Sequence, residues 1–76
     1  MEVTIFTGPG CTSCERAKAF LRERHIGFVE RDVASDAAAM NELVSRGCRM
    51  LPVICVGDRI TQGFNPQELQ QLIDGR

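Results

Sequence analysis

The N-terminal part of the chain alternates between strand-like and helix-like patterns, and this alternation restricts the fold more than any other feature. Residues 3–6 are a short run of β-forming side chains, Val-Thr-Ile-Phe. Residues 12 to about 25 carry apolar side chains at helical spacing, and this helix is expected to end near Gly27. Residues 28–33 predict a second strand. Because two strands joined by a helix are parallel with a right-handed crossover, the chain begins with a βαβ unit.

The sequence after this unit predicts a helix and a hairpin. A helix is expected to start at Ser35 and Asp36 and to end at a C-cap at Gly47. Its expected apolar face consists of Met40, Leu43 and Val44. Residues 53–56 are continuously apolar, as in a strand covered on both faces, and a turn leads from them into a strand over residues 59–62.

The final helix has three signals in register at its start. Asn65 suits the N-cap, Pro66 suits the first helical position, and Glu68 occupies the capping-box position. The expected order is therefore β-α-β-α-β-β-α. This order predicts an α/β fold with a mixed four-stranded sheet flanked by three helices, whose last two strands form an antiparallel hairpin.

Length and composition exclude several classes of function. With 76 residues the chain is expected to form one domain over residues 1–76, and we expect a monomer. The formal net charge is -1 and the basic residues are scattered among acidic ones, so no nucleic-acid partner is expected. We recognise no basic and apolar leader, and no stretch approaches the roughly 18 apolar residues of a membrane span. The expectation is a cytoplasmic protein without a membrane partner.

The most informative motif is a pair of cysteines, Cys11 and Cys14, at the point where a loop after the first strand becomes a helix. Sites in such sheets gather beyond the carboxyl ends of strands. The unpaired amides and the dipole of a helix N-terminus favour a thiolate, and the pKa of cysteines in such pairs falls to about 3.5 to 7.5. Cys11 is therefore predicted to be the nucleophile. Cys14 lies one turn further in and is predicted to resolve the mixed disulfide that Cys11 forms with a substrate.

Other interpretations of the cysteines compete with this one. The four cysteines would form two structural disulfides in a secreted mini-protein, but the chain has a good apolar core and no export signal. A closed zinc site would need two further ligands, for which only His25, Cys48 and Cys55 are available, so no metal is expected. Cys55 is interpreted as a small buried apolar residue, and Cys48 either as inert or as a thiol open to glutathionylation or to a second disulfide.

Two basic residues of the first helix receive structural interpretations. His25 is expected at the end of this helix, where a positive charge is favourable. Lys18 lies one turn beyond Cys14 and is interpreted as part of a solvated helix face, the alternative being that it helps to hold the thiolate.

With these motifs the chain resembles the thioredoxin fold in its glutaredoxin form. The resemblance is carried by Cys11-Thr12-Ser13-Cys14, by Leu51-Pro52 before the third strand and by Gly63-Phe64 before the last helix. It implies a redox-active disulfide between Cys11 and Cys14. It also implies a cis peptide bond at Leu51-Pro52, whose preceding backbone pairs with an extended substrate segment. The substrate-binding residues that it implies are Thr12, Ser13, Arg49, Leu51, Pro52, Gly63 and Phe64.

Two positions distinguish glutaredoxins that take electrons from glutathione from those that do not. Glutathione-dependent glutaredoxins typically carry a lysine at the position of Gly8 and a Gly-Gly followed by an acidic pair near the last helix. This chain lacks both and is more similar to NrdH-type redoxins, in the Gly-Cys-Arg-Met-Leu-Pro segment at 47–52 and in the Gln-Gly-Phe-Asn-Pro segment at 62–66. That similarity implies thioredoxin reductase as donor and a protein disulfide, such as that of ribonucleotide reductase, as acceptor.

Some positions depart from this pattern. Thr61 stands where these redoxins usually have Trp, Asn65 replaces an Arg, and Thr12-Ser13 differs from the usual pair between the cysteines. The expectation is therefore a general dithiol redoxin with no tightly bound cofactor. The alternatives are a glutathione-dependent glutaredoxin, with glutathione as co-substrate and Arg49 offering a charge, and a glutaredoxin that shares an iron–sulfur cluster between two copies through Cys11. Phe64 either presents an apolar patch to a partner or packs on Leu69 as a hydrophobic staple.

Overall fold

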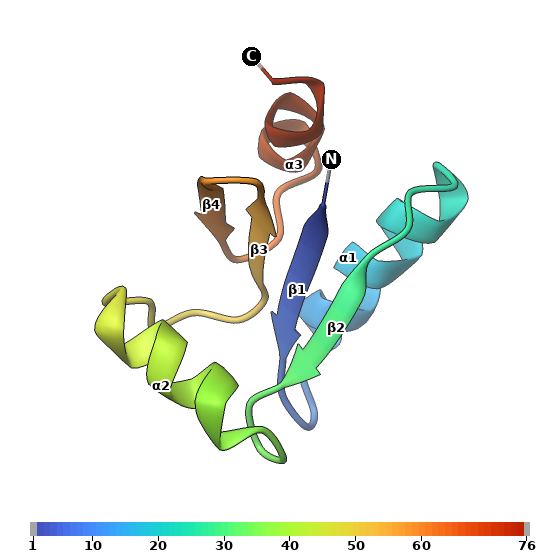
Figure 1. Ribbon diagram of the computed structural model, residues 1–76. Coiled ribbons are helices and arrows are strands. Elements are labelled where there is room, and N and C mark those ends of the chain that lie inside the picture. The colour runs from blue at the N-terminus through green and yellow to red at the C-terminus, as the bar shows by residue number, and fades with distance from the viewer. Residues whose placement is uncertain (1, 76) are drawn as a thin grey trace.

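The computed structural model describes residues 2–75. Its helices and strands follow one another in the predicted order (Figure 1). They are β1 (Val3–Thr7), α1 (Thr12–Glu23), β2 (Val29–Asp32), α2 (Ala37–Ser45), β3 (Val53–Val56), β4 (Arg59–Gln62) and α3 (Pro66–Asp74). Among these helices none is long and apolar enough to cross a membrane.

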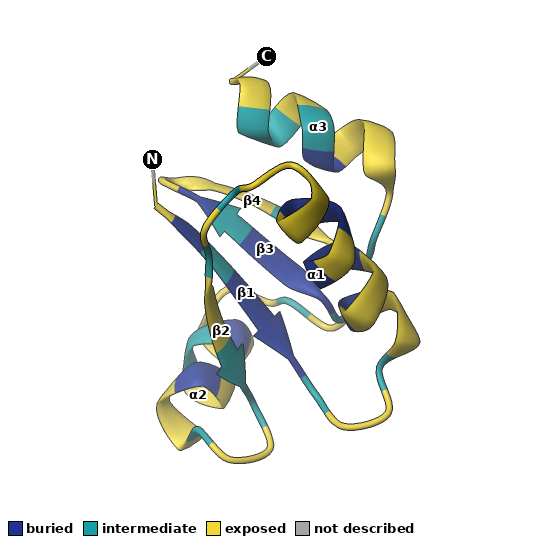
Figure 2. Ribbon diagram, turned by 90° about the vertical axis from the view of Figure 1, so that its right-hand side faces the viewer, coloured by how far each residue is buried: buried dark blue, intermediate teal, exposed yellow. Residues whose placement is uncertain are grey.

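The strands form one mixed sheet in the order β2-β1-β3-β4. β1 and β2 are parallel, with Thr4 opposite Val29, whereas β3 is antiparallel to both β1 and β4. The helix α2 lies on one face of the sheet, and α1 and α3 lie on the other (Figures 1 and 2). This is the thioredoxin-like architecture that the sequence predicts.

Two apolar clusters hold the layers together, one on each face of the sheet. The larger cluster lies under α1 and α3 and consists of Val3, Ile5, Ala17, Phe20, Leu21, Ile54, Val56 and Leu69. The smaller cluster lies under α2 and consists of Phe6, Ala39, Leu43 and Val53. Because β3 is central and contributes to both clusters, its continuously apolar sequence is explained by burial on both faces.

The predicted helix caps are confirmed at three positions. The Asp36 carboxylate accepts a hydrogen bond from the Ala39 amide at the start of α2. Gly47 ends the same helix with a left-handed backbone, φ 70°. Asn65 Oδ1 accepts from the amides of Gln67 and Glu68 at the start of α3.

Some local expectations are wrong. The first helix ends at Glu23, and the left-handed residue after it is His25, φ 57°, instead of Gly27. The reason is that the Ile26 amide bonds to the Leu21 carbonyl, and Ile26 packs against the larger apolar cluster, so the chain must turn before Gly27.

The apolar face of α2 also differs from the expected one. Met40 and Val44 are exposed, and α2 buries Ala39 and Leu43, which lie four residues apart and face the sheet. In α3, the capping-box interpretation of Glu68 is not supported, because its carboxylate accepts from the Thr61 hydroxyl across to β4.

Candidate active site

Cys11 and Cys14 form a disulfide at the start of α1. Cys11 is the N-cap residue, and its Sγ accepts a hydrogen bond from the Cys14 amide at 3.1 Å. That amide is one of the N–H groups that a helix leaves unpaired at its N-terminus, so it favours negative charge on the Cys11 sulfur. Cys11 is half-buried, and Cys14 is only 1% exposed. A partner therefore reaches Cys11 before Cys14, which is the asymmetry expected of a nucleophile and a resolving thiol.

The segment before β3 provides the second part of the site. Its Leu51–Pro52 bond is cis, as the resemblance implies. The Pro52 carbonyl accepts from the Gly63 amide at 2.8 Å, so Gly63 lies directly beside the proline. Gln62 holds the same segment in place, because its side-chain oxygen accepts from the amides of Arg49 and Met50 at 2.9 and 3.2 Å.

A close contact connects this segment to the cysteine loop. A Cβ atom added to Gly8 would lie 2.8 Å from Leu51 Cδ1, closer than such atoms approach. The Leu51 side chain thus packs directly over the backbone of Gly8, three residues before Cys11. The structure therefore brings together the cysteine loop, Leu51-Pro52 and Gly63.

The other predicted binding residues differ in their surroundings. Thr12 and Ser13 are exposed at the first turn of α1, and Arg49 is exposed on the loop before Leu51. Phe64 is half-buried, packs against the apolar cluster that contains Leu69, and meets the Phe20 ring edge to face at 5.8 Å. The packing of Phe64 agrees with its staple interpretation and leaves part of the ring accessible.

A groove of about 440 Å³ adjoins Cys11 on the β2 side. It is lined by Thr7, Gly8, Pro9, Gly10, Cys11, Thr12, Glu15, Glu30 and Asp32. Because Cys11 lines this groove, a substrate segment that enters the groove can contact the Cys11 sulfur.

Lys18 belongs to a polar network in the wall of this groove, and its expected place on a solvated face is wrong. Its Nζ lies 2.7 Å from Glu15 Oε2 and 3.0 Å from Glu30 Oε2, and the Thr7 hydroxyl donates to the same Glu30 oxygen. The hydrogen bonds that Lys18 donates to Glu15 and then to Glu30 raise the pKa of Lys18 above its ordinary value. The hydrogen bond from Lys18, and then that from Thr7, lower the pKa of Glu30.

Sequence reasoning missed this network and the role of Gln62. The signal for Lys18 was present, because positions 14, 17, 18 and 21 form one helical stripe and the other three of these residues are apolar. No comparable signal marked Glu30 or Gln62, whose partners lie on other elements.

The other two cysteines, Cys48 and Cys55, are free and half-buried. Burial is the largest of the effects that raise the pKa of Cys55. Within residues 2–75 no group of three or more His, Cys, Asp or Glu side chains is placed to hold a metal ion.

A disulfide of Cys-X-X-Cys spacing, formed at a helix N-terminus beside a cis-proline loop in this fold, defines a thiol–disulfide oxidoreductase. The family model described as Glutaredoxin matches residues 3–60, and the chain belongs to that family.

Individual relatives agree with this assignment. The solved structure of the glutaredoxin-like protein NrdH-redoxin from Escherichia coli is 32% identical, with a TM-score of 0.89 and 95% of both chains covered. A glutaredoxin-like 8.6 kDa protein in the rubredoxin operon of Clostridium pasteurianum is 33% identical over 73 residues, 95% of this chain and 97% of that protein. The global transcriptional regulator Spx of Bacillus subtilis is 46% identical over 41 residues, and this match spans only 31% of the regulator's length.

Proposed function

We propose that the chain is a dithiol electron carrier that reduces disulfides of protein substrates through Cys11 and Cys14. The observation that carries this proposal is the unequal exposure of the two bonded sulfurs at the start of α1, Cys11 half-buried and Cys14 1% exposed. An accessible sulfur receives the substrate, and a shielded neighbour is kept for the second step.

The proposed reaction has two exchanges. In the reduced protein the Cys11 thiolate attacks a substrate disulfide, so that a bond between Cys11 and one substrate sulfur forms and the other substrate sulfur leaves as a thiolate that takes up a proton. Cys14, after losing its proton, then attacks the Cys11 sulfur. The Cys11–Cys14 disulfide forms, the second substrate thiol is released, and two electrons have passed to the substrate. The cis segment at Leu51-Pro52 offers its backbone to the extended substrate beside these sulfurs.

Thioredoxin reductase is the electron donor that we propose. The contact between Gly8 and Leu51 supports this choice, because Leu51 Cδ1 occupies the space where the glutathione-gripping lysine would begin. The similarity to NrdH-redoxin supports it as well, since that protein is described as having a thioredoxin-like activity profile. The proposed acceptor is a protein disulfide such as that of ribonucleotide reductase.

The donor is tested by supplying the oxidised protein with NADPH and one of two systems, thioredoxin reductase or glutathione with glutathione reductase. We expect NADPH oxidation with thioredoxin reductase. Reduction by the glutathione system alone would reject the proposed donor and favour a glutathione-dependent glutaredoxin. The Cys11→Ser variant is the matched control and should oxidise no NADPH with either system.

A further inference from the structure

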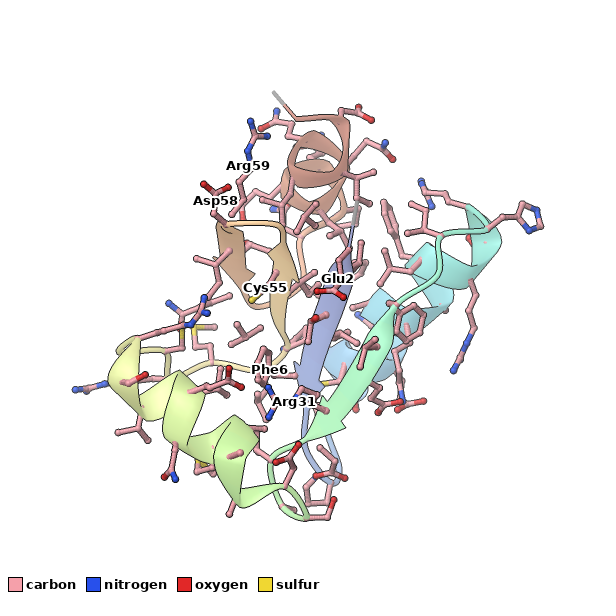
Figure 3. The ribbon with its side chains drawn as sticks, viewed as in Figure 1. Glu2, Phe6, Arg31, Cys55, Asp58 and Arg59 are labelled. Carbon is pink, nitrogen blue, oxygen red and sulfur yellow. A yellow bond between two sulfur atoms is a disulfide. The ribbon has the colours of Figure 1, made fainter. Side chains whose placement is uncertain are left out.

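Cys48 and Cys55 are thiols that the reaction above does not use, and the fold places them on the same side of the sheet. Both pack against the smaller apolar cluster under α2. Figure 3 shows the Cys55 side chain on the α2 side of β3, the side on which Phe6 also lies. Cys48 lies three residues after the end of α2 at Ser45, and its amide donates to the Leu43 carbonyl at 2.9 Å. The two thiols thus pack against one cluster, one from the loop and one from the strand.

The loop that begins at Cys48 is also fixed to the strands next to Cys55. The amides of Arg49 and Met50 donate to the Gln62 side chain, and Gln62 pairs with Val53 between β4 and β3. Val53 and Cys55 are two residues apart in β3 and therefore point to the same face of the sheet. Cys48 and Cys55 therefore pack against the same small cluster, one from the loop that Gln62 holds and one from the strand beside it.

Both thiols are half-buried, but only Cys48 lines a groove on this side of the sheet. Cys48 lines an open, mainly apolar groove of about 160 Å³, together with Val33, Met40, Leu43, Val44, Arg49 and Leu51. Cys55 lies in a central strand between β1 and β4 and does not line this groove. A small disulfide that enters the groove therefore meets Cys48 first.

We propose that Cys48 and Cys55 are a second dithiol pair, which a small-molecule disulfide oxidises to an intramolecular disulfide. The Cys48 thiolate attacks the small disulfide, so that a mixed disulfide forms and one small thiolate leaves and takes up a proton. Cys55 then loses its proton and attacks the Cys48 sulfur, which releases the second small thiol. The protein loses two protons and two electrons, which together are two hydrogen atoms, and one small disulfide gains them and becomes two thiols.

The new bond would change the primary site. It closes a loop from residue 48 to residue 55 that contains Leu51 and Pro52, which lie beside the cysteine loop. When the surrounding small thiols are oxidised, the second disulfide forms. It then restrains Leu51 and Pro52, the segment proposed to bind the substrate.

The experiment uses the full chain with Cys11→Ser and Cys14→Ser, so that only Cys48 and Cys55 can react. The folded variant, checked by circular dichroism, is incubated with glutathione disulfide, and the product is analysed by intact mass and by alkylation in denaturant. We expect a loss of two hydrogen atoms without bound glutathione, and a fall from two alkylated thiols to none, reversed by dithiothreitol. In the same background, Cys55→Ser should retain one glutathione on Cys48.

Three results would overturn the proposal. They are a stable glutathione adduct while both thiols are present, no reaction at all, and a disulfide between two chains instead of within one. Because Cys11 and Cys14 are absent from this variant, none of these results bears on the proposed electron-carrier function.

Discussion

Cys11 differs from the other three cysteines in being the N-cap of a helix, with the Cys14 amide directed at its sulfur. A thiol in this position should ionise more readily than a free thiol, whose pKa is about 8.5. A variant that keeps only Cys11, with Cys14, Cys48 and Cys55 changed to Ser, isolates this property. Its alkylation rate by iodoacetamide should reach half its maximum at a pH below about 7.5. A half-maximum near that of a free thiol would contradict the role of the helix N-terminus.

Gly8 offers a second test at a single position. The Gly8→Ala variant places a Cβ against Leu51 and forces this side chain to move. We expect a loss of about 1 kcal/mol in the free energy of unfolding, measured by urea titration with circular dichroism, together with slower reduction of a protein disulfide. Gly27→Ala is the matched control, because its Cβ would meet no atom within 4 Å. Equal activity of the two variants would show that Leu51 need not be held over position 8.

Single residues were predictable from the sequence where their role is local. Cys11 and Asn65 act on the first turn of their own helices, and a pattern of a few residues predicts both positions. Lys18 and Gln62 act through partners on other elements. The sequence pattern does not predict which residues of those elements will lie beside them. Leu51 belongs to this second kind, because its contact with Gly8 exists only after the chain has folded.

Among the helices and strands, the network of Lys18, Glu30 and Thr7 connects α1 to β2 and β1 behind the active site. Because the folded pKa of Glu30 lies below its ordinary value of 4.5, its ionised form stabilises the folded state above that pH. This contribution is lost as the pH falls from about 4.5 through the lowered pKa. The urea midpoint of Glu30→Gln should therefore fall less on acidification than that of the wild-type protein.

The control for this pH experiment is Glu23→Gln, which removes the same charge from an exposed position of α1 that forms no ion pair within residues 2–75. It should keep the pH dependence of the wild-type protein. Identical acid profiles for Glu30→Gln and the wild-type protein would mean that the network does not stabilise the fold.

The elements themselves were largely predictable, because each has a periodic apolar pattern and most have a terminal signal. The errors have local physical causes. His25 takes the left-handed position because Ile26 packs against the larger apolar cluster. In α2, Ala39 is buried with Leu43 because both pack against Phe6 and Val53 of the sheet. Tertiary packing decides both outcomes, and a periodic pattern alone contains neither.

For the chain as one body, the site is assembled from three segments that are far apart in sequence. The cysteine loop follows β1, the cis-proline segment precedes β3, and Gly63 follows β4. The βαβ pattern placed the first segment beyond the end of a strand, whereas the resemblance to glutaredoxins was needed to place the second and third beside it. The sheet order β2-β1-β3-β4 explains why they meet, since β1 and β3 are antiparallel neighbours whose adjoining ends bring the loops together.

The division of roles between Cys11 and Cys14 is tested most directly by trapping the reaction with a disulfide-containing protein substrate. The Cys14→Ser variant should accumulate a mixed disulfide in which one copy of the chain is joined through Cys11 to one substrate molecule, visible by non-reducing electrophoresis and intact mass. The Cys11→Ser variant should form none. A complex trapped through Cys14, or equal turnover of the substrate by both variants, would contradict the account.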